Sequence, residues 1–166
     1  MKLLDPIKVL DSDKKGSTHQ GYQWVYPNPT EKLVLFNYRK GRGQHGPKEM
    51  LVDYNGYLQC DGYTVYDKIG ADPKLEAVFM DGRIELDNNL IENAIRPMAI
   101  GRKNYLFCGS HKAAQNAAML YSFFGSCKMQ NSNPREWLED TLQRIPDHSI
   151  LKLEELLPGY QEKNTV

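Results

Sequence analysis

The stretch Gly21-Tyr22-Gln23-Trp24-Val25-Tyr26 is rich in aromatic and β-branched residues, which favour an extended strand. Pro27-Asn28-Pro29 closes it with turn-forming residues, and Leu33-Val34-Leu35-Phe36-Asn37-Tyr38 supplies a second apolar strand. On the N-terminal side, Ile7-Lys8-Val9-Leu10 alternates weakly, and a polar turn follows it at residues 11–16. Three strands separated by turn signals predict an antiparallel meander.

The middle of the chain adds a helix and a fourth strand to this meander. A basic, glycine-rich loop leads into a short helix predicted from Pro47 to Asp53. Tyr57-Leu58-Gln59-Cys60 then predicts a strand that ends at Asp61. A strand, a helix and a strand after a meander indicate an α+β or α/β layered fold.

The second half of the chain predicts helices. Asn89 and Glu92 have the form of a capping box at the start of one helix, and Pro97 limits that helix. Ser110 caps the next helix, which ends at Gly125. Its apolar stripe at helical spacing consists of Ala113, Ala117, Tyr121 and Phe124.

Two further apolar segments follow towards the C-terminus. Asn133-Pro134-Arg135-Glu136 is a capping box with proline at the first helical position. The apolar face predicted for that helix is Trp137, Leu138, Leu142 and Ile145. The last apolar segment contains Leu151, Leu153, Leu156 and Leu157, and residues 159–166 are expected to form a loose tail.

Length, charge and cysteine usage restrict the class of protein. The 166 residues are enough for one domain with a real core. The 21 basic and 21 acidic residues cancel, so any contact with nucleic acid has to use local basic patches. Three scattered cysteines favour free thiols in a reducing cytoplasm. The absence of a membrane-length apolar run and of a signal-peptide pattern predicts a cytoplasmic protein with no membrane partner.

Asp61 and Glu92 are the candidate catalytic residues. An acid at the end of a strand and an acid in the first turn of a helix could share a divalent metal, and such carboxylate clusters cut or join phosphodiesters. Each acid also has an ordinary structural explanation. Asp61 precedes Gly62 in a common turn pair, and Glu92 completes the capping box. Spacing alone favours these structural roles over catalysis.

The predicted helix around Glu92 carries a polar face. Asn88, Glu92 and Arg96 are four residues apart and therefore share one side of the helix. Arg96 could contact phosphate or simply pair with Glu92. Arg102-Lys103-Asn104-Tyr105 then interleaves basic and aromatic residues, which suits phosphate contact and base stacking but equally suits a solvated loop.

Two motifs resemble the signature of a transposase family. Asp87-Asn88-Asn89-Leu90-Ile91-Glu92-Asn93-Ala94-Ile95-Arg96-Pro97, continued by 101–107 and by Gly109-Ser110, resembles a conserved block of the IS66 family of bacterial insertion-sequence transposases. Gly56-Tyr57-Leu58-Gln59, followed after one residue by Asp61-Gly62-Tyr63, is similar to that family's second-acid motif. The C-terminal helices and Leu153-Glu154-Glu155-Leu156-Leu157-Pro158 resemble its C-terminus. The resemblance covers two blocks, roughly 1–72 and 79–158.

The resemblance implies a ribonuclease H-like fold with a DDE site of two aspartates and one glutamate. Two divalent ions, Mg²⁺ or Mn²⁺, would activate water or a DNA 3′-hydroxyl and stabilise the leaving oxygen. Asp61 matches the second acid and Glu92 the third, and both would bind metal. Asn88, Arg96, Arg102 and Lys103 match positions expected to face DNA.

The sequence departs from the family pattern in three ways. Alignment on Pro6 places Leu3 at the first acid, and Asp5 lies two residues, or about 6.6 Å, further along the strand. Because the paired metals are about 3.5–4 Å apart, Asp5 can replace that acid only if the strand slides. The interval between Asp61 and Glu92 lacks the family's long helical insert, and the N-terminal DNA-recognition parts are missing.

The sequence therefore predicts an α/β, ribonuclease H-like mixed sheet with a helical C-terminal half. We expect a catalytic-core remnant at 1–109, a helical part at 110–158 packed on it, and the tail at 159–166. The expected function is that of an insertion-sequence DNA transposase, truncated and inactive, with Asp61, Glu92 and Asp5 as its acids. Its partners would be DNA ends and a second copy or a full-length transposase. The alternatives are a non-catalytic DNA- or transposase-binding module and a decayed reading frame.

Overall fold

An antiparallel meander of three strands forms the centre of the structure, a computed structural model that describes residues 4–11, 16–54, 56–57, 75–76, 89–105 and 107–160. Strands β1 (Leu4–Leu10), β2 (Thr18–Asn28) and β3 (Leu33–Arg39) pair in that order. Asp5 pairs with Gln23 across β1 and β2, and Tyr38 pairs with Gln23 across β2 and β3. The predicted meander is confirmed.

A short helix and a small strand pair follow the meander. Helix α1 (His45–Met50) begins before Pro47 and ends earlier than the predicted boundary at Asp53. Strand β4 (Gly56–Tyr57) pairs in parallel with β5 (Leu75–Glu76). The rest of the predicted strand up to Cys60, and Asp61 itself, lie outside the described residues.

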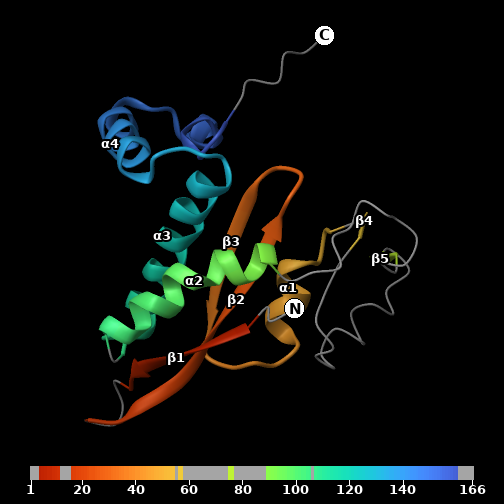
Figure 1. The fold of residues 1–166 in the computed structure, drawn as a ribbon, viewed down its shortest axis with the longest axis vertical. Coiled ribbons are helices and arrows are strands. Elements are labelled where there is room, and N and C mark those ends of the chain that lie inside the picture. Colours follow the sequence, from red (N-terminus) through yellow and green to blue (C-terminus); the bar gives the residue numbers. More distant parts are fainter. Residues whose placement is uncertain are drawn as a thin grey trace.

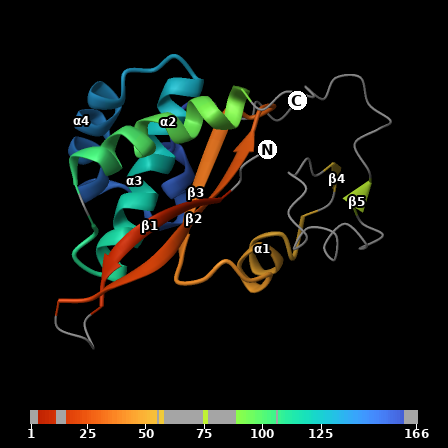
Figure 2. The same cartoon turned by 60° about the horizontal axis from the view of Figure 1, so that its bottom comes forward.

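The C-terminal half is helical, as predicted. It consists of α2 (Asn89–Asn104), α3 (His111–Met129), α4 (Pro134–Arg144) and the 3₁₀ segments η2 (Ile145–Asp147) and η3 (Ile150–Leu156). Helices α2 and α3 lie on one side of the sheet, whereas α1 lies on the other (Figures 1 and 2). Between α2 and α3, Cys108 forms a parallel bridge with Val9 of β1. The described residues therefore form a mixed α/β layer structure.

The hydrophobic core lies between the sheet and these two helices. Each strand contributes alternate residues to it, because successive side chains of a strand point to opposite faces. Met98 of α2 is almost fully buried, and Ala114 and Ala118 of α3 face the sheet. The strand residues of this cluster are Ile7, Val9, Val25, Val34, Phe36 and Tyr38.

Helix α3 closes the free edge of β3 with side-chain hydroxyls. The backbone N–H of Phe36 donates to Ser122 Oγ at 2.8 Å, and that of Val34 donates to Ser126 Oγ at 3.1 Å. Both serines are buried, and Ser126 Oγ also lies 3.3 Å from the Val34 carbonyl oxygen. An open strand edge is a template for pairing with another chain, so these bonds protect the sheet as well as holding α3 against it.

Small residues bring α3 and β3 close enough for these bonds. A Cβ at Gly125 would lie 2.6 Å from Val34 Cγ1, which is too close for any non-glycine residue without movement. On the sheet itself, a Cβ at Gly21 would lie 2.5 Å from the ring of Tyr38. Glycine is therefore required at both positions by close approach.

Two predicted helix starts are confirmed by their caps. Ser110 Oγ accepts a hydrogen bond from the Ala113 N–H at 3.0 Å at the start of α3. Asn133 Oδ1 accepts one from Arg135 N–H, and the Asn133 amide contacts Glu136 Oε1 at 2.9 Å, with Pro134 in the first turn of α4. These contacts satisfy N–H groups that a helix leaves unbonded at its start.

Two predicted helix boundaries were wrong. Helix α2 continues through Pro97 to Asn104, and α3 continues past Gly125 to Met129. Pro97 has no N–H to donate to the carbonyl oxygen of Asn93, four residues earlier. Because Asn93 is exposed, water can bond that oxygen instead, and the helix continues. Gly125 remains helical because packing against Val34 outweighs its low intrinsic propensity.

The predicted apolar faces of α3 and α4 also need correction. The buried residues of α3 are Ala114, Ala118, Ser122, Ser126 and Cys127, so the buried face is displaced by one or two positions from the predicted stripe. Helix α4 buries none of its residues, and Leu142 is 60% exposed. Of the final apolar segment, Leu156 is buried, whereas Leu151 is 88% exposed.

We predict that Ser122→Ala lowers the free energy of unfolding by about 1–3 kcal/mol, because the buried Phe36 N–H loses its acceptor. Urea denaturation measures the change. Ser132→Ala, at an exposed serine, is the matched control and should stay within about 0.5 kcal/mol of wild type. Equal stability of the two variants would contradict the edge-closing role of Ser122.

Candidate functional site

Asp5 lies on β1 on the core-facing side of the sheet. Its side chain lies on the same face of β1 as those of Ile7 and Val9, and the residue is only 5% exposed. Its cross-strand partner is Gln23, so the two side chains lie on the same face as direct neighbours. Burial of a carboxyl group on an otherwise apolar strand face is costly without polar neighbours, and Gln23 is one such neighbour.

Gln23 is a site residue that sequence reasoning did not single out. It is fully buried, and its Nε2 donates to the Ala114 carbonyl oxygen at 3.3 Å. Because that partner is an acceptor, the amide orientation is fixed and Oε1 must face another direction. Within the described residues, Oε1 has no hydrogen-bond partner. The sequence signal was a lone amide within an aromatic strand.

Glu92 and Arg96 lie on the exposed side of α2. Glu92 is in the first turn of the helix, and both side chains are exposed to solvent. Among the ion pairs of the described residues, none joins Glu92 to Arg96. The alternative in which Arg96 simply neutralises Glu92 therefore finds no support in this arrangement.

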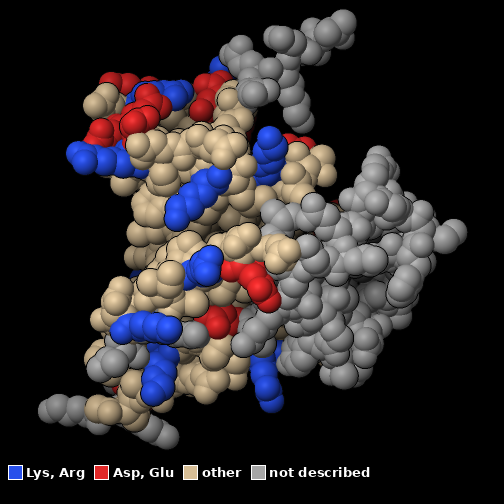
Figure 3. All heavy atoms as spheres, viewed as in Figure 1, with Lys and Arg blue, Asp and Glu red and all other residues tan. Residues whose placement is uncertain are grey.

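The other predicted DNA-facing positions are described to different extents. Lys103 lies in the last turn of α2 and is exposed. Arg102 belongs to the same turn, but its side chain is outside the described part of the structure, as are Asn88 and Asp61 entirely. Basic side chains lie along the band occupied by α2 together with acidic ones, and acids and bases also mix over α4 (Figure 3).

The oxygen donors around Asp5 suit a hard cation in chemical type. Magnesium prefers carboxylate, amide and water oxygens, and the Asp5 carboxylate with the unpartnered Gln23 Oε1 supplies the first two. Over the described ranges, however, no group of three His, Cys, Asp or Glu residues could hold a metal ion. A complete cation site at Asp5 would therefore need ligands from outside those ranges, where Asp61 lies.

A second polar cluster missed from the sequence lies at the other edge of the sheet. The Tyr38 hydroxyl and His111 Nδ1 are 2.7 Å apart, and the His19 ring packs edge-on against His111 at 5.6 Å. His19 Nε2 lies 2.6 Å from the Lys40 carbonyl oxygen. Burial raises the pKa of Tyr38 to about 12, so its hydroxyl keeps its proton at neutral pH and can donate to His111. These residues are far apart in sequence, so no local pattern could reveal the cluster.

We predict that the free energy of unfolding falls as the pH rises from about 10 to about 12. The Tyr38 pKa is raised in the folded state above its ordinary value near 10, so the stabilising effect of the neutral hydroxyl is complete below pH 10 and disappears towards pH 12. Denaturant titrations across this range should show a shallower fall for Tyr38→Phe. Tyr160→Phe, at an exposed tyrosine, should retain the wild-type slope; equal slopes in all three proteins would contradict the assignment.

Comparison with protein families gives two matches that together cover most of the chain. The model described as "Transposase IS66 family" matches residues 5–79 and 70–116. The model described as "IS66 C-terminal element" matches residues 122–158. Both Asp5 and the exposed α2 face therefore lie inside the matched ranges.

Curated relatives are longer proteins from Sinorhizobium fredii. The chain is 43% identical over 83 residues to the uncharacterized protein y4hP, and this matched stretch makes up 49% of the chain and 15% of that protein. It is 46% identical over 71 residues to the uncharacterized protein y4qI, covering 43% of this chain and 13% of that protein. The chain thus spans less than a fifth of the relatives it matches. No solved structure matches it.

Proposed function

Because the chain belongs to the IS66 family of transposases, we propose that it is a transposase remnant that binds insertion-sequence DNA but does not complete strand cleavage and transfer. The observation that carries this proposal is the exposed polar face of α2, inside the range matched by the family model. Arg96 and Lys103 project from that face into solvent. The whole relatives are several times longer, so their activity is not assumed for this chain.

The α2 face offers positive charge without a described counter-ion. Neither Arg96 nor Lys103 takes part in an ion pair among the described residues. Since the chain as a whole carries no net charge, such local groups have to provide any attraction to DNA phosphates. Arg102 is proposed as a third contact and Asn88 as a fourth, by their positions in the family block. Phosphate contacts of this kind position DNA without reading its sequence.

The catalytic part of the proposal concerns Asp61, Glu92 and Asp5. With Asp61 and Glu92 as ligands, Mg²⁺ or Mn²⁺ would supply a Lewis acid and an activated nucleophile for attack on a phosphodiester. Asp5, with Gln23 beside it, offers further oxygen donors from β1. Exposed Glu92 on α2 and buried Asp5 on β1 are in very different surroundings, which supports impaired assembly of the three acids.

Two further observations support the ancestry of the fold. The antiparallel meander followed by helices fits the start of a ribonuclease H-like domain, which we propose as its origin. The family model matches in two separate stretches whose junction lies at 70–79. That junction falls in the interval where the sequence lacks the family's helical insert. The missing insert and the leucine in place of the first acid are the grounds for proposing lost activity.

Membrane association is not part of this proposal. Within the described residues, none of the helices has both the length and the apolar character needed to cross a bilayer. We propose a cytoplasmic protein that meets DNA ends and also a second copy or a full-length transposase.

We predict that Lys103→Glu and Arg96→Glu each weaken binding to duplex DNA carrying the insertion-sequence ends. Each lost phosphate contact should reduce the slope of log K against log salt by about 0.9, because fewer counterions are released. Fluorescence anisotropy at several salt concentrations measures both quantities. Arg135→Glu is the control, since it makes the same charge change at an exposed position on α4. Absence of binding by the wild-type protein at low salt would remove the proposal.

We predict that the wild-type protein with Mg²⁺ or Mn²⁺ yields no more cleaved or joined DNA than Glu92→Gln. The reason is that β1 carries its acid at position 5, two residues from the position the family uses. Labelled insertion-sequence ends at high protein concentration provide the assay. A metal-dependent product that the wild-type chain forms and Glu92→Gln does not would establish an active enzyme instead.

A further inference from the structure

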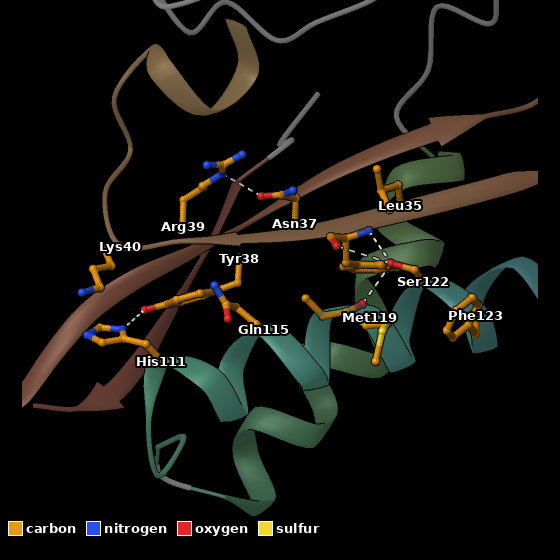
Figure 4. A pocket seen from close by; sticks show the side chains of 12 residues that line it. Leu35, Asn37, Tyr38, Arg39, Lys40, His111, Gln115, Met119, Ser122 and Phe123 are labelled. Carbon is orange, nitrogen blue, oxygen red and sulfur yellow. Dashed lines mark hydrogen bonds between the residues drawn. The ribbon is translucent and has the colours of Figure 1, made fainter. Parts of the chain in front are cut away.

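Helix α3 and the end of β3 enclose a groove that the proposed α2 face does not use. The helix closes the strand edge at Val34 and Phe36 through its serines, but beyond Phe36 no serine follows on that stripe, because position 118 is alanine. A groove of about 590 Å³ runs along this edge, lined by residues 35–39 of β3, by Lys40 and by α3 residues between His111 and Phe123 (Figure 4).

One end of the groove is polar and positive. Lys40 comes from the strand side, and His111 and Gln115 come from the helix side, whereas the Arg39 side chain points away from α3 and pairs with Glu49 (Figure 4). Among the residues that the structure describes, none of those lining the groove is acidic. Among the described residues, no carboxylate pairs with the exposed Lys40 ammonium group. In a chain with no net charge, an entirely acid-free lining of this kind is complementary to an anion.

The polar groups at this end are held in place by the protein. The Arg39 guanidinium donates to Asn37 Oδ1 at 2.8 Å and to Glu49 Oε2 at 2.9 Å. The Tyr38 hydroxyl fixes the His111 ring through Nδ1. Fixed donors cost less entropy on binding than mobile ones.

The other end of the groove is apolar and accessible. Met119 is 51% exposed, and Phe123 lies beyond it, half-buried against Trp137. Leu35, which is 41% exposed, also borders the groove but lies on the other side of β3 (Figure 4). Large apolar side chains that face an aqueous groove suit a flat, poorly hydrated group. A phosphate-binding end joined to an apolar end matches the two parts of a nucleotide, and single-strand sites combine these features.

We propose that the groove between β3 and α3 binds an unpaired stretch of DNA, with phosphates at Lys40 and Gln115 and a base against Met119. This inference rests on the proposed DNA-binding function and specifies the form of DNA that one part of the molecule takes. A paired base cannot present its face to Met119 without leaving the stack, so the groove selects unpaired nucleotides. The α2 face, by contrast, requires only phosphates.

Two matched pairs of variants test the groove with a fluorescein-labelled oligothymidylate in anisotropy titrations. Lys40→Ala should weaken binding severalfold and reduce the salt slope by about 0.7, whereas Lys128→Ala, at an exposed lysine of α3 outside the groove, should change neither. Met119→Ala should weaken binding without changing the salt slope. Leu120→Ala is its control, because Leu120 is similarly exposed but does not line the groove.

An abasic strand of the same length and a duplex separate this inference from the proposed function. Met119→Ala should leave binding of the abasic strand unchanged, and both groove variants should leave duplex binding unchanged. If the groove variants behave like their controls, or weaken duplex and single strand equally, the inference is overturned. If Arg96→Glu loses duplex binding but still binds oligothymidylate as tightly as the wild-type protein, the result supports two separate sites. If the wild-type protein does not bind duplex DNA, but the groove variants bind oligothymidylate more weakly than the wild type, only the α2 proposal is overturned.

Discussion

Two serine hydroxyls on one helix hold this structure together at the edge of its sheet. In the part of the chain that the structure describes, β3 has no strand on its outer side, and Ser122 and Ser126 take that place by bonding the outward-facing backbone groups of Phe36 and Val34. The bonds demand close approach, which Gly125 allows, and they fix the position of α3 along the strand. Once α3 is fixed, the core between the sheet and Met98 of α2 can close around residues from all three strands.

The same constraint arranges the polar parts of the molecule. Gln23 donates to the carbonyl of Ala114, so the position of α3 also determines the surroundings of Gln23 and of its neighbour Asp5. At the opposite edge of the sheet, the first turn of α3 brings His111 to Tyr38 and shapes the groove beside Lys40. The proposed catalytic remnant and the proposed single-strand groove therefore share one scaffold, although they occupy different strands.

Local patterns predicted the local parts of the fold. The meander followed from aromatic strands separated by prolines and polar turns, and the caps at Ser110 and Asn133 followed from short-range side-chain chemistry. The boundaries at Pro97 and Gly125 could not be predicted in this way, since tertiary packing outweighs propensity at both. The face of α3 was misplaced because serines count as polar in a sequence pattern, yet two of them are buried against a strand edge. The site was predicted from family motifs, whereas Gln23 and the Tyr38–His111 pair depend on contacts between distant segments.

Amide hydrogen exchange at Val34 and Phe36 tests the central claim most directly. Both amides lie on the outer edge of β3, where they would be open to water if α3 were absent. Closure by the serine hydroxyls predicts slow exchange, comparable with that of the amides bonded between β1 and β2, through openings close to global unfolding. Exchange at the rate of a solvent-exposed edge would show that α3 is not held against β3 as described here.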